Sequence, residues 1–302
     1  YKGALLVITA TIMQSCFVAK EYKRPELKTE NLYRNEVVAT DTTSLGNVAW
    51  DQIFTDPLLQ GYIKKGLENN LDIRIAMQNL VAAEATMKQG KAGYFPTLSA
   101  STDWTHQELS KNSQFGALLS QNGSNSTDQY QFAANLSWEA DIWGKIRSNE
   151  RATNARFFQT IAVNQAVKTQ LIANIASTYF QLLALDSQLA LAKATLVNRN
   201  AGVETIRALK DAGNVNEVGV KQTEAQKYAT ELIIADVETN IVLLENAMSV
   251  LLNQGPEKIE RSTLDSQQFN QEIVTGVPAN LLRNRPDVVA AEYNFISNFE
   301  YT

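Results

Sequence analysis

Two rows of apolar residues, spaced at alternating steps of three and four, constrain this chain more than any other feature. The rows lie between about residues 146 and 252, on either side of the short sequence DAGN at 211–214. The first row comprises Ile175, Thr178, Leu182, Leu185, Leu189, Ala192, Leu196, Val203 and Ile206, and the second comprises Ile234, Val237, Ile241, Leu244, Met248 and Leu251. Such steps form a heptad seam, which is typical of a coiled coil. We therefore predict an antiparallel helical hairpin, whose first helix, over 146–210, is about 100 Å long.

Composition argues against several classes of function. The 302 residues are 44% apolar and 20% charged, which is sufficient for a substantial core. The net charge of -5 and the absence of a basic cluster argue against a nucleic-acid partner. One cysteine and one histidine exclude disulfide frameworks and clusters of Cys and His ligands. Because nucleotide-binding glycine loops and a His-Glu-x-x-His motif are also missing, we expect no cofactor, no metal and no enzymatic activity.

A change of period from 3.6 to 2 after residue 96 predicts two strands. Leu98, Ala100, Thr102, Trp104 and His106 alternate with small polar residues in the first run. In the second run, Tyr130, Phe132, Ala134, Leu136 and Trp138 alternate with Gln131, Ala133, Asn135, Ser137 and Glu139. The stretch 111–128, rich in Ser, Asn, Gln and Gly, predicts a solvated loop between them.

Two environments are compatible with this strand hairpin. Aromatic residues at both ends of an alternating strand are typical of a membrane strand with interfacial girdles. The same alternation also fits a half-buried sheet edge in a soluble α+β domain. A two-stranded hairpin is not stable alone and must join further strands. An oligomeric barrel provides these strands if every copy of the chain contributes its own.

Two shorter helices are predicted before the strands. The first begins at Asp56 and Pro57, and the second begins at about residue 72 and ends before Gly93.

A second long-range feature is an internal repeat. The sequence LENNLDI at 67–73 aligns with LRNRPDV at 282–288, an offset of 215. We therefore expect one repeat and the start of a second, as in a truncated chain.

Four stretches in the same order along the chain resemble one known family. They are AGYFPTL at 92–98, SWEADIWGKIR at 137–147, AGN at 212–214 with Glu217 and Val218, and PANLLRNRPDVVAAE at 278–292. Together they resemble the helix and strand junctions, the helical tip and the repeat signature of TolC-type outer membrane efflux proteins. The similarity is to the lipoprotein branch that serves RND pumps.

The resemblance implies a mainly α fold with a membrane β-hairpin: a long antiparallel α-helical coiled-coil hairpin plus two strands of a trimeric outer-membrane β-barrel, the first of two tandem repeats. It implies an efflux exit duct in the outer membrane of a Gram-negative bacterium, lipid-anchored and extending into the periplasm. The implied partners are two further copies in a homotrimer, a periplasmic adaptor (membrane fusion) protein, an inner-membrane RND transporter and outer-membrane lipids. Two alternatives to a duct are a periplasmic coiled-coil adaptor and a scaffold protein.

The N-terminal residues predict a lipoprotein signal peptide. One positive charge precedes a short apolar run, and MQSC at 13–16 resembles a bacterial lipobox. Cys16 is then the lipidated residue that anchors the protein to a bilayer surface. The alternative is an ordinary signal peptide with an incidental cysteine.

Two further groups of site residues are predicted. Tyr130, Trp138 and Trp143 are membrane-interface candidates, with core packing as the alternative for Trp143. Asp211, Gly213, Asn214, Val215, Glu217 and Val218 form a candidate adaptor-contact tip. The alternative for the tip is that Gly213 only permits a left-handed turn. We expect Asp141 to cap the helix that follows the second strand.

These observations predict seven segments along the chain. They are a signal peptide (1–15), a lipid-anchored extended arm (16–54), equatorial and tunnel helices (55–95), a β-barrel hairpin (96–140), a long helical tunnel hairpin (141–253), a linker (254–277) and a truncated start of a second repeat (278–302).

Overall fold

The structure, a computed structural model, describes residues 22–24, 48–120, 123, 126–267 and 284–301. The chain divides into two compact units, which we treat separately. The first unit is built around Ala85–Asn154, and the second comprises Arg24–Glu84 and Ala155–Ile296. Three helices contribute residues to both units: α4 (Leu71–Ala92), α6 (Lys145–Asp211) and α9 (Pro286–Tyr301). The predicted signal peptide (1–15), most of the predicted arm (16–54), and residues 268–283 of the predicted linker and second repeat lie outside the described residues.

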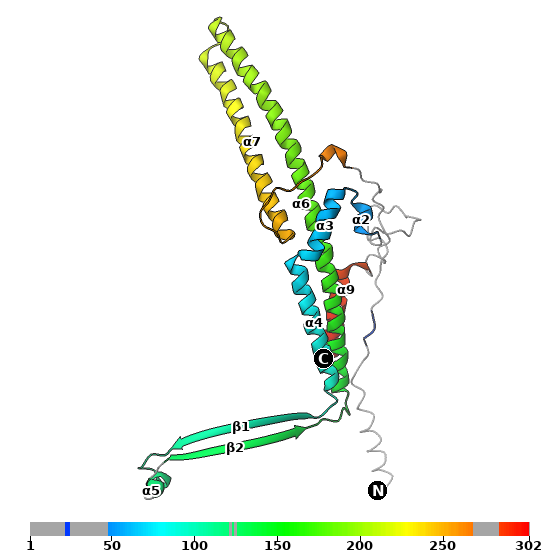
Figure 1. The fold of residues 1–302 in the computed structure, drawn as a ribbon, viewed down its shortest axis with the longest axis vertical. Coiled ribbons are helices and arrows are strands. Elements are labelled where there is room, and N and C mark those ends of the chain that lie inside the picture. Colours follow the sequence, from blue (N-terminus) through cyan, green and yellow to red (C-terminus); the bar gives the residue numbers. More distant parts are fainter. Residues whose placement is uncertain (1–21, 25–47, 121–122, 124–125, 268–283, 302) are drawn as a thin grey trace, which may run out of the picture. The chain divides into compact units, whose positions relative to one another are not determined.

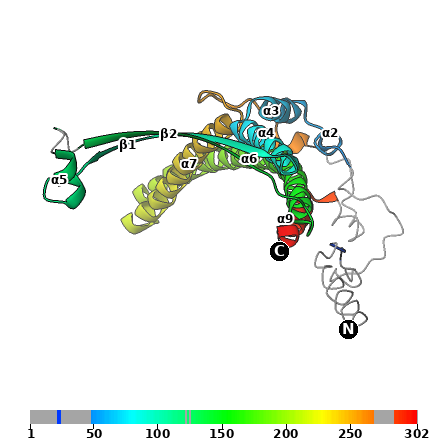
Figure 2. The same ribbon diagram turned by 90° about the horizontal axis from the view of Figure 1, so that it is seen from below.

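The first unit contains the strand hairpin. Strands β1 (Thr97–Glu108) and β2 (Ser126–Ser137) pair antiparallel and lie side by side in both views (Figures 1 and 2). The register runs without interruption from Thr97 opposite Ser137 to Glu108 opposite Ser126. Residues with one parity therefore share one face of the hairpin over its whole length.

The prediction of a loop over 111–128 is wrong in two parts of that stretch. Helix α5 (Gln114–Ser120) forms inside it, and β2 begins at Ser126, because residues 126–129 complete the ladder opposite 105–108. Strand β2 also ends at Ser137, so Trp138 follows the strand rather than belonging to it.

The second unit contains the predicted helical hairpin. Helix α6 spans 67 residues and pairs with α7 (Glu217–Leu251), which lies beside it in Figure 1. Every residue of both predicted heptad rows is buried or partly buried. Ion pairs cross between the two helices from Lys193 to Glu238 at 2.8 Å and from Arg207 to Glu224 at 2.7 Å. The antiparallel hairpin and its seams are therefore confirmed.

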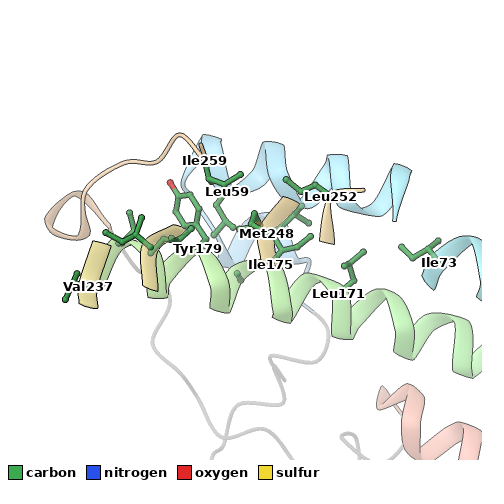
Figure 3. Close-up of a cluster of buried hydrophobic side chains, with 14 residues drawn as sticks. Leu59, Ile73, Leu171, Ile175, Tyr179, Val237, Met248, Leu252 and Ile259 are labelled. Atoms are coloured by element: carbon green, nitrogen blue, oxygen red, sulfur yellow. The ribbon is translucent and has the colours of Figure 1, made fainter. Parts of the chain in front are cut away.

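The core of this unit gathers side chains from five segments (Figure 3). They are α3 (Pro57–Asn69), α4, α6, α7 and the stretch that follows α7. The fully buried members include Leu59, Ile63, Ile175, Tyr179, Leu182, Leu183, Met248, Leu252 and Ile259. Burial of each such apolar side chain contributes about 1.5–3 kcal/mol, so this cluster fixes α3 and the post-α7 stretch against the helical hairpin.

Two capping residues set where α3 and α4 begin. The Asp56 carboxylate accepts a hydrogen bond from Leu58 N at 2.8 Å, at the end where Pro57 occupies the first helical position. The Asn70 side chain accepts from Asp72 N at 2.8 Å and donates to the Leu251 carbonyl at 2.9 Å. The break between the two predicted helices is thus held against the end of α7.

Helices α3 and α4 bury only part of their apolar residues. Leu58 and Met77, which lie in the apolar patterns of the two helices, are 40% and 44% exposed, because the packed stripe of each helix is narrower than its apolar pattern. The helix starts agree with the predicted repeat offset, since residue 286, where α9 begins, lies 215 positions after residue 71, where α4 begins. None of the helices in the described ranges is both long and apolar enough to cross a membrane.

Candidate functional site: a two-faced strand hairpin and a helical tip

The strand hairpin has one apolar face, formed by the even-numbered residues. Trp104 and Tyr130 are directly paired and stack with ring centroids 6.5 Å apart. Next to them, Trp104 Nε1 donates to Asp128 Oδ1 at 3.2 Å, and His106 Nδ1 lies 2.7 Å from the same oxygen. These contacts place an aromatic pair and then a polar pair in succession along one face.

This face is exposed in the chain by itself. The exposed fractions are 71% for Leu98, 63% for Trp104, 76% for Tyr130, 76% for Phe132 and 72% for Leu136. A continuous exposed apolar surface of this kind marks contact with a membrane or with another protein. The aromatic pair bounds its apolar part, as aromatic girdles bound the lipid-facing band of membrane strands.

The opposite face of the hairpin is polar. Its residues in β1 are Thr97, Ser99, Ser101, Asp103, Thr105 and Gln107, and its residues in β2 are Thr127, Gln129, Gln131, Ala133, Asn135 and Ser137. Hydroxyl and amide groups dominate this face, so it is suited to water. The hairpin therefore separates an apolar environment from an aqueous one.

The junction from β2 to α6 is held by hydrogen bonds. Asp141 accepts from Ile146 N at 2.9 Å and from Arg147 N at 3.1 Å, which confirms its predicted capping role. Gly144 has a φ of 77°, a left-handed conformation that permits the sharp turn into the helix. Lys145 pairs with Glu139 at 2.8 Å.

The two tryptophans of the junction differ in their surroundings. Trp138 is 63% exposed, and its Nε1 donates to the Tyr94 carbonyl at 3.1 Å, linking the two ends of the hairpin. Trp143 is 75% exposed, so it does not pack in a core formed by the residues that the structure describes. With Tyr130, both remain predicted membrane-interface residues, because their polar edges and apolar rings suit a headgroup layer.

The helical tip is a tight turn between α6 and α7. Gly213 has a φ of 79°, and its N–H donates to the Lys210 carbonyl at 2.9 Å, while Asn214 N donates to the Leu209 carbonyl at 2.9 Å. These two bonds satisfy carbonyls at the end of α6, as expected for a glycine-terminated helix. Asn216, which was not predicted, caps α7 by accepting from Gly219 N at 3.2 Å.

The predicted tip residues are not equivalent. Asp211, Gly213, Asn214 and Glu217 are exposed, and Val218 is 61% exposed. Val215 is partly buried and faces Gly219, at which an added Cβ would lie 2.7 Å from Val215 Cγ1. Val215 therefore belongs to the packing of the turn, whereas Val218 offers an accessible apolar contact.

Ion pairs join the two helices just behind the tip. Lys210 binds Glu217 at 2.5 Å, while Glu224 binds both Lys221 at 2.9 Å and Arg207 at 2.7 Å. Hydrogen bonds from Lys221 and then Arg207 lower the pKa of Glu224 to about 2. Sequence reasoning missed this cluster, although the three-residue spacing of Lys221 and Glu224 indicates a pair on one helix face.

The predicted lipidation site, Cys16, lies outside the described residues. Within them, a two-faced strand hairpin that leads into a long heptad-paired helix is typical of duct proteins that combine membrane strands with a helical tunnel. The family model described as outer membrane efflux protein matches residues 62–254, and the chain belongs to this family.

Curated relatives agree with this assignment. A probable efflux pump outer membrane protein, TtgC of Pseudomonas putida, is 27% identical over 296 residues, which cover 95% of this chain and 60% of the relative. A probable outer membrane lipoprotein, SilC of Salmonella typhimurium, is 25% identical over 96% of this chain and 61% of its own. The chain thus spans about three fifths of the length of these relatives.

Solved structures share the fold. The open state of the Neisseria gonorrhoeae MtrE outer membrane channel superimposes with a TM-score of 0.70 at 24% identity, covering 93% of this chain and 61% of that one. The outer-membrane channel OprN superimposes with a TM-score of 0.68, also at 24% identity, covering 91% of this chain and 62% of that one. The chain therefore shares its mainly helical fold with a strand hairpin with these solved outer-membrane channels.

Proposed function

We propose that this chain is part of an exit duct of a tripartite efflux pump, which carries small molecules passively across the outer membrane. Three copies of the complete protein each contribute strands to one barrel and helices to one periplasmic tunnel. An inner-membrane RND transporter supplies the energy, and a periplasmic adaptor joins it to the duct. Family membership supports the class of protein, and the strand hairpin supports its location.

The observation that carries this proposal is the difference between the two faces of the hairpin. A face with Trp104, Tyr130 and Phe132 exposed is unfavourable in water and favourable in lipid. The opposite polar face is suited to an aqueous lumen. Since the two faces alternate residue by residue, a single hairpin can form part of the wall between lipid and water.

The tip supports the proposed contact with the adaptor. The ion pairs of Lys210 and Glu224 hold the two helices together behind the turn, so the turn is presented on a braced end. Val218 provides an exposed apolar group there. The exposed polar groups of Asp211 and Asn214 would surround it, as a polar rim surrounds an apolar contact.

The alternative is a periplasmic adaptor or scaffold, which also uses a coiled-coil hairpin. The exposed apolar face of β1 and β2 favours the duct, because a water-soluble scaffold does not need it. Cell fractionation separates the two. Recovery of the full-length protein in the soluble periplasm without detergent would establish the alternative.

The decisive experiment is deletion of the gene in its own host, followed by measurement of the accumulation of a fluorescent lipophilic dye. Deletion should raise accumulation, and the wild-type gene should restore the original level. Val218→Asp should restore it poorly at an equal amount of protein in the outer membrane, because a buried unpaired charge opposes docking. Val218→Thr, which keeps shape without adding charge, is the matched control. Full restoration by Val218→Asp would contradict docking at the tip.

The proposed lipidation of Cys16 can be tested separately from docking at the tip. Cys16→Ser should abolish incorporation of radiolabelled palmitate, while the strand hairpin and the helical tip remain unchanged. Incorporation into the Cys16→Ser protein would show that Cys16 is not the anchor.

A further inference from the structure

A cavity of about 560 Å³ lies between α4, α6 and α9. All of the residues that line it belong to the second unit, in which α9 lies beside α6 in both views (Figures 1 and 2). Its volume is within the usual range for small-molecule sites, about 300–1,000 Å³. None of its lining residues belongs to the strand hairpin or to the helical tip, so it is a separate candidate site.

Most of the cavity wall is apolar. Phe158 of α6 and Tyr293 of α9 stack across it, with ring centroids 5.4 Å apart. The aliphatic part of the wall includes Met77, Leu80, Ile161 and Val289. Phe158, Ile161 and Met77 are exposed, so the cavity offers accessible apolar surface. This surface suits a ligand with an apolar body.

The polar groups of the cavity include two donors one helical turn apart. Asn164 and Lys168 both line the cavity, and their spacing of four residues places them on one face of α6. Asn164 is 7% exposed, and its Nδ2 has no hydrogen-bond partner in the described part of the chain. Lys168 is partly buried and forms no ion pair with a described residue. A buried donor without an acceptor is unfavourable, so both groups are suited to a ligand that accepts.

The lining contains no aspartate or glutamate, so the charge of Lys168 is not offset within it. A ligand cation would be repelled there. A single negative charge matches the single ammonium, and the amide of Asn164 can donate a second hydrogen bond to the same group. A strongly hydrophilic anion would lose water without covering the apolar wall.

We propose that this cavity binds an amphipathic monoanion, whose carboxylate pairs with Lys168 and Asn164 and whose aromatic or aliphatic body lies against Phe158, Tyr293 and the aliphatic wall. The site lies within one chain. The inference therefore goes beyond the proposed function and does not depend on export of solutes by the protein.

The test uses 4-benzoylbenzoate, an aromatic carboxylate that attaches to neighbouring C–H bonds when illuminated. The purified full-length gene product, in nanodiscs of zwitterionic lipid, is illuminated with the probe, and mass spectrometry maps the labelled residues. We expect labelling at Met77 or another lining residue. Biphenyl-4-carboxylate should suppress it, whereas 4-phenylbenzylamine, which carries the opposite charge on the same rings, should not.

Variants of the two donors identify the polar contacts. Lys168→Met should lower labelling of the cavity at least about fivefold at a low probe concentration, and Lys168→Arg should retain most of it. Asn164→Leu should lower labelling with no loss of stability, because it removes a donor that has no partner. Lys65→Met, the same change at an exposed lysine of α3, should leave labelling unchanged.

Three results would overturn the inference. The first is no labelling of the cavity in the wild-type protein, as expected if another part of the full-length chain fills it. The second is labelling confined to the apolar face of the strand hairpin, as expected for a probe that only enters the lipid. The third is equal suppression by the carboxylate and the amine. Each of these results leaves the dye-accumulation test of the duct unaffected.

Discussion

The hydroxyl group of Tyr179 donates a hydrogen bond to the Asp56 carboxylate at 2.7 Å, joining the middle of α6 to the start of α3. The same carboxylate oxygen accepts from Ser262 Oγ at 2.5 Å and from Gln267 Nε2 at 2.9 Å. Asp56 therefore combines a helix cap with a three-donor acceptor site. This network fixes α3 and the stretch after α7 to one point on the long helix.

Replacement of Asp56 should reveal this double role. In Asp56→Asn, the amide oxygen can keep the hydrogen bond that caps α3. The NH₂ group then faces the three donors Tyr179, Ser262 and Gln267 and cannot accept a hydrogen bond from them. We therefore expect the free energy of unfolding to fall by about 2–3 kcal/mol. Tyr179→Phe removes one donor and should cost about 1–2 kcal/mol. Thermal unfolding of the purified full-length variants measures both losses. Equal stability of Asp56→Asn and the wild type would show that the network contributes nothing.

The same carboxylate predicts a dependence on acid. Burial raises the pKa of Asp56, but hydrogen bonds from Ser262, Gln267 and Tyr179 outweigh it and hold the pKa at about 2, below the reference value of 3.8. Because the folded-state pKa is the lower one, the stabilisation of about 2 kcal/mol is present above about pH 4 and is lost as the pH falls toward about 2. The difference in stability between wild type and Asp56→Asn should therefore shrink over this range, as measured by denaturant unfolding. A difference that stays constant would contradict the lowered pKa.

Arg261 forms a second connection in this unit, and its loss should be costly. Its guanidinium binds Asp186 at 2.5 Å and 2.8 Å and Glu245 at 2.6 Å, which links the stretch after α7 to both helices of the hairpin. Arg261→Met leaves the mostly buried Glu245 unpaired, so we expect a loss of about 2–3 kcal/mol, moderated because Asp186 is 40% exposed. Adding Glu245→Gln should recover part of the loss in the same thermal assay. An absence of recovery would show that the lost stability comes from the packing of the Arg261 side chain rather than from the unpaired charge of Glu245.

The features that could be predicted from the sequence alone are those that depend on the spacing of residues within a few positions of one another. The seams of α6 and α7 follow from heptad steps, and the parity of β1 and β2 follows from alternation, because both patterns repeat within a few residues. The partners of Asp56 and Arg261 could not be predicted. Ser262 lies 206 residues from Asp56 and Asp186 lies 75 residues from Arg261, so these contacts depend on the path of the chain in three dimensions. Helix α5 was missed because polar composition does not distinguish a short helix from a loop.

A close approach between α4 and α6 in the first unit makes another residue sensitive to size. A Cβ added at Gly90 would lie 2.3 Å from Thr153 Oγ1 and 3.2 Å from its Cβ, and the β-branched threonine has little freedom to move. Gly90→Ala should therefore lower the melting midpoint, with a cost of about 1–3 kcal/mol. Gly61→Ala is the matched control, because no atom lies within 4 Å of the added Cβ and alanine favours a helix by about 0.5–1 kcal/mol. Stabilisation by both changes would show that the two helices separate more readily than the structure indicates.

Labelling of neighbouring residues on β1 should separate the two faces of the strand hairpin. Ser101 and Thr102 are both exposed in the chain, but Ser101 shares the polar face with Ala133, whereas Thr102 is paired with Phe132 on the apolar face. In intact cells, a water-soluble thiol reagent should modify Ser101→Cys and leave Thr102→Cys unmodified, because a thiol in lipid does not ionise and the reagent does not enter the hydrocarbon. The parent protein measures any labelling of Cys16, and Asn135→Cys with Ala134→Cys repeats the comparison on β2. Equal modification of both members of each pair would mean that the apolar face does not contact lipid, and another protein would then be the candidate to cover Trp104 and Tyr130.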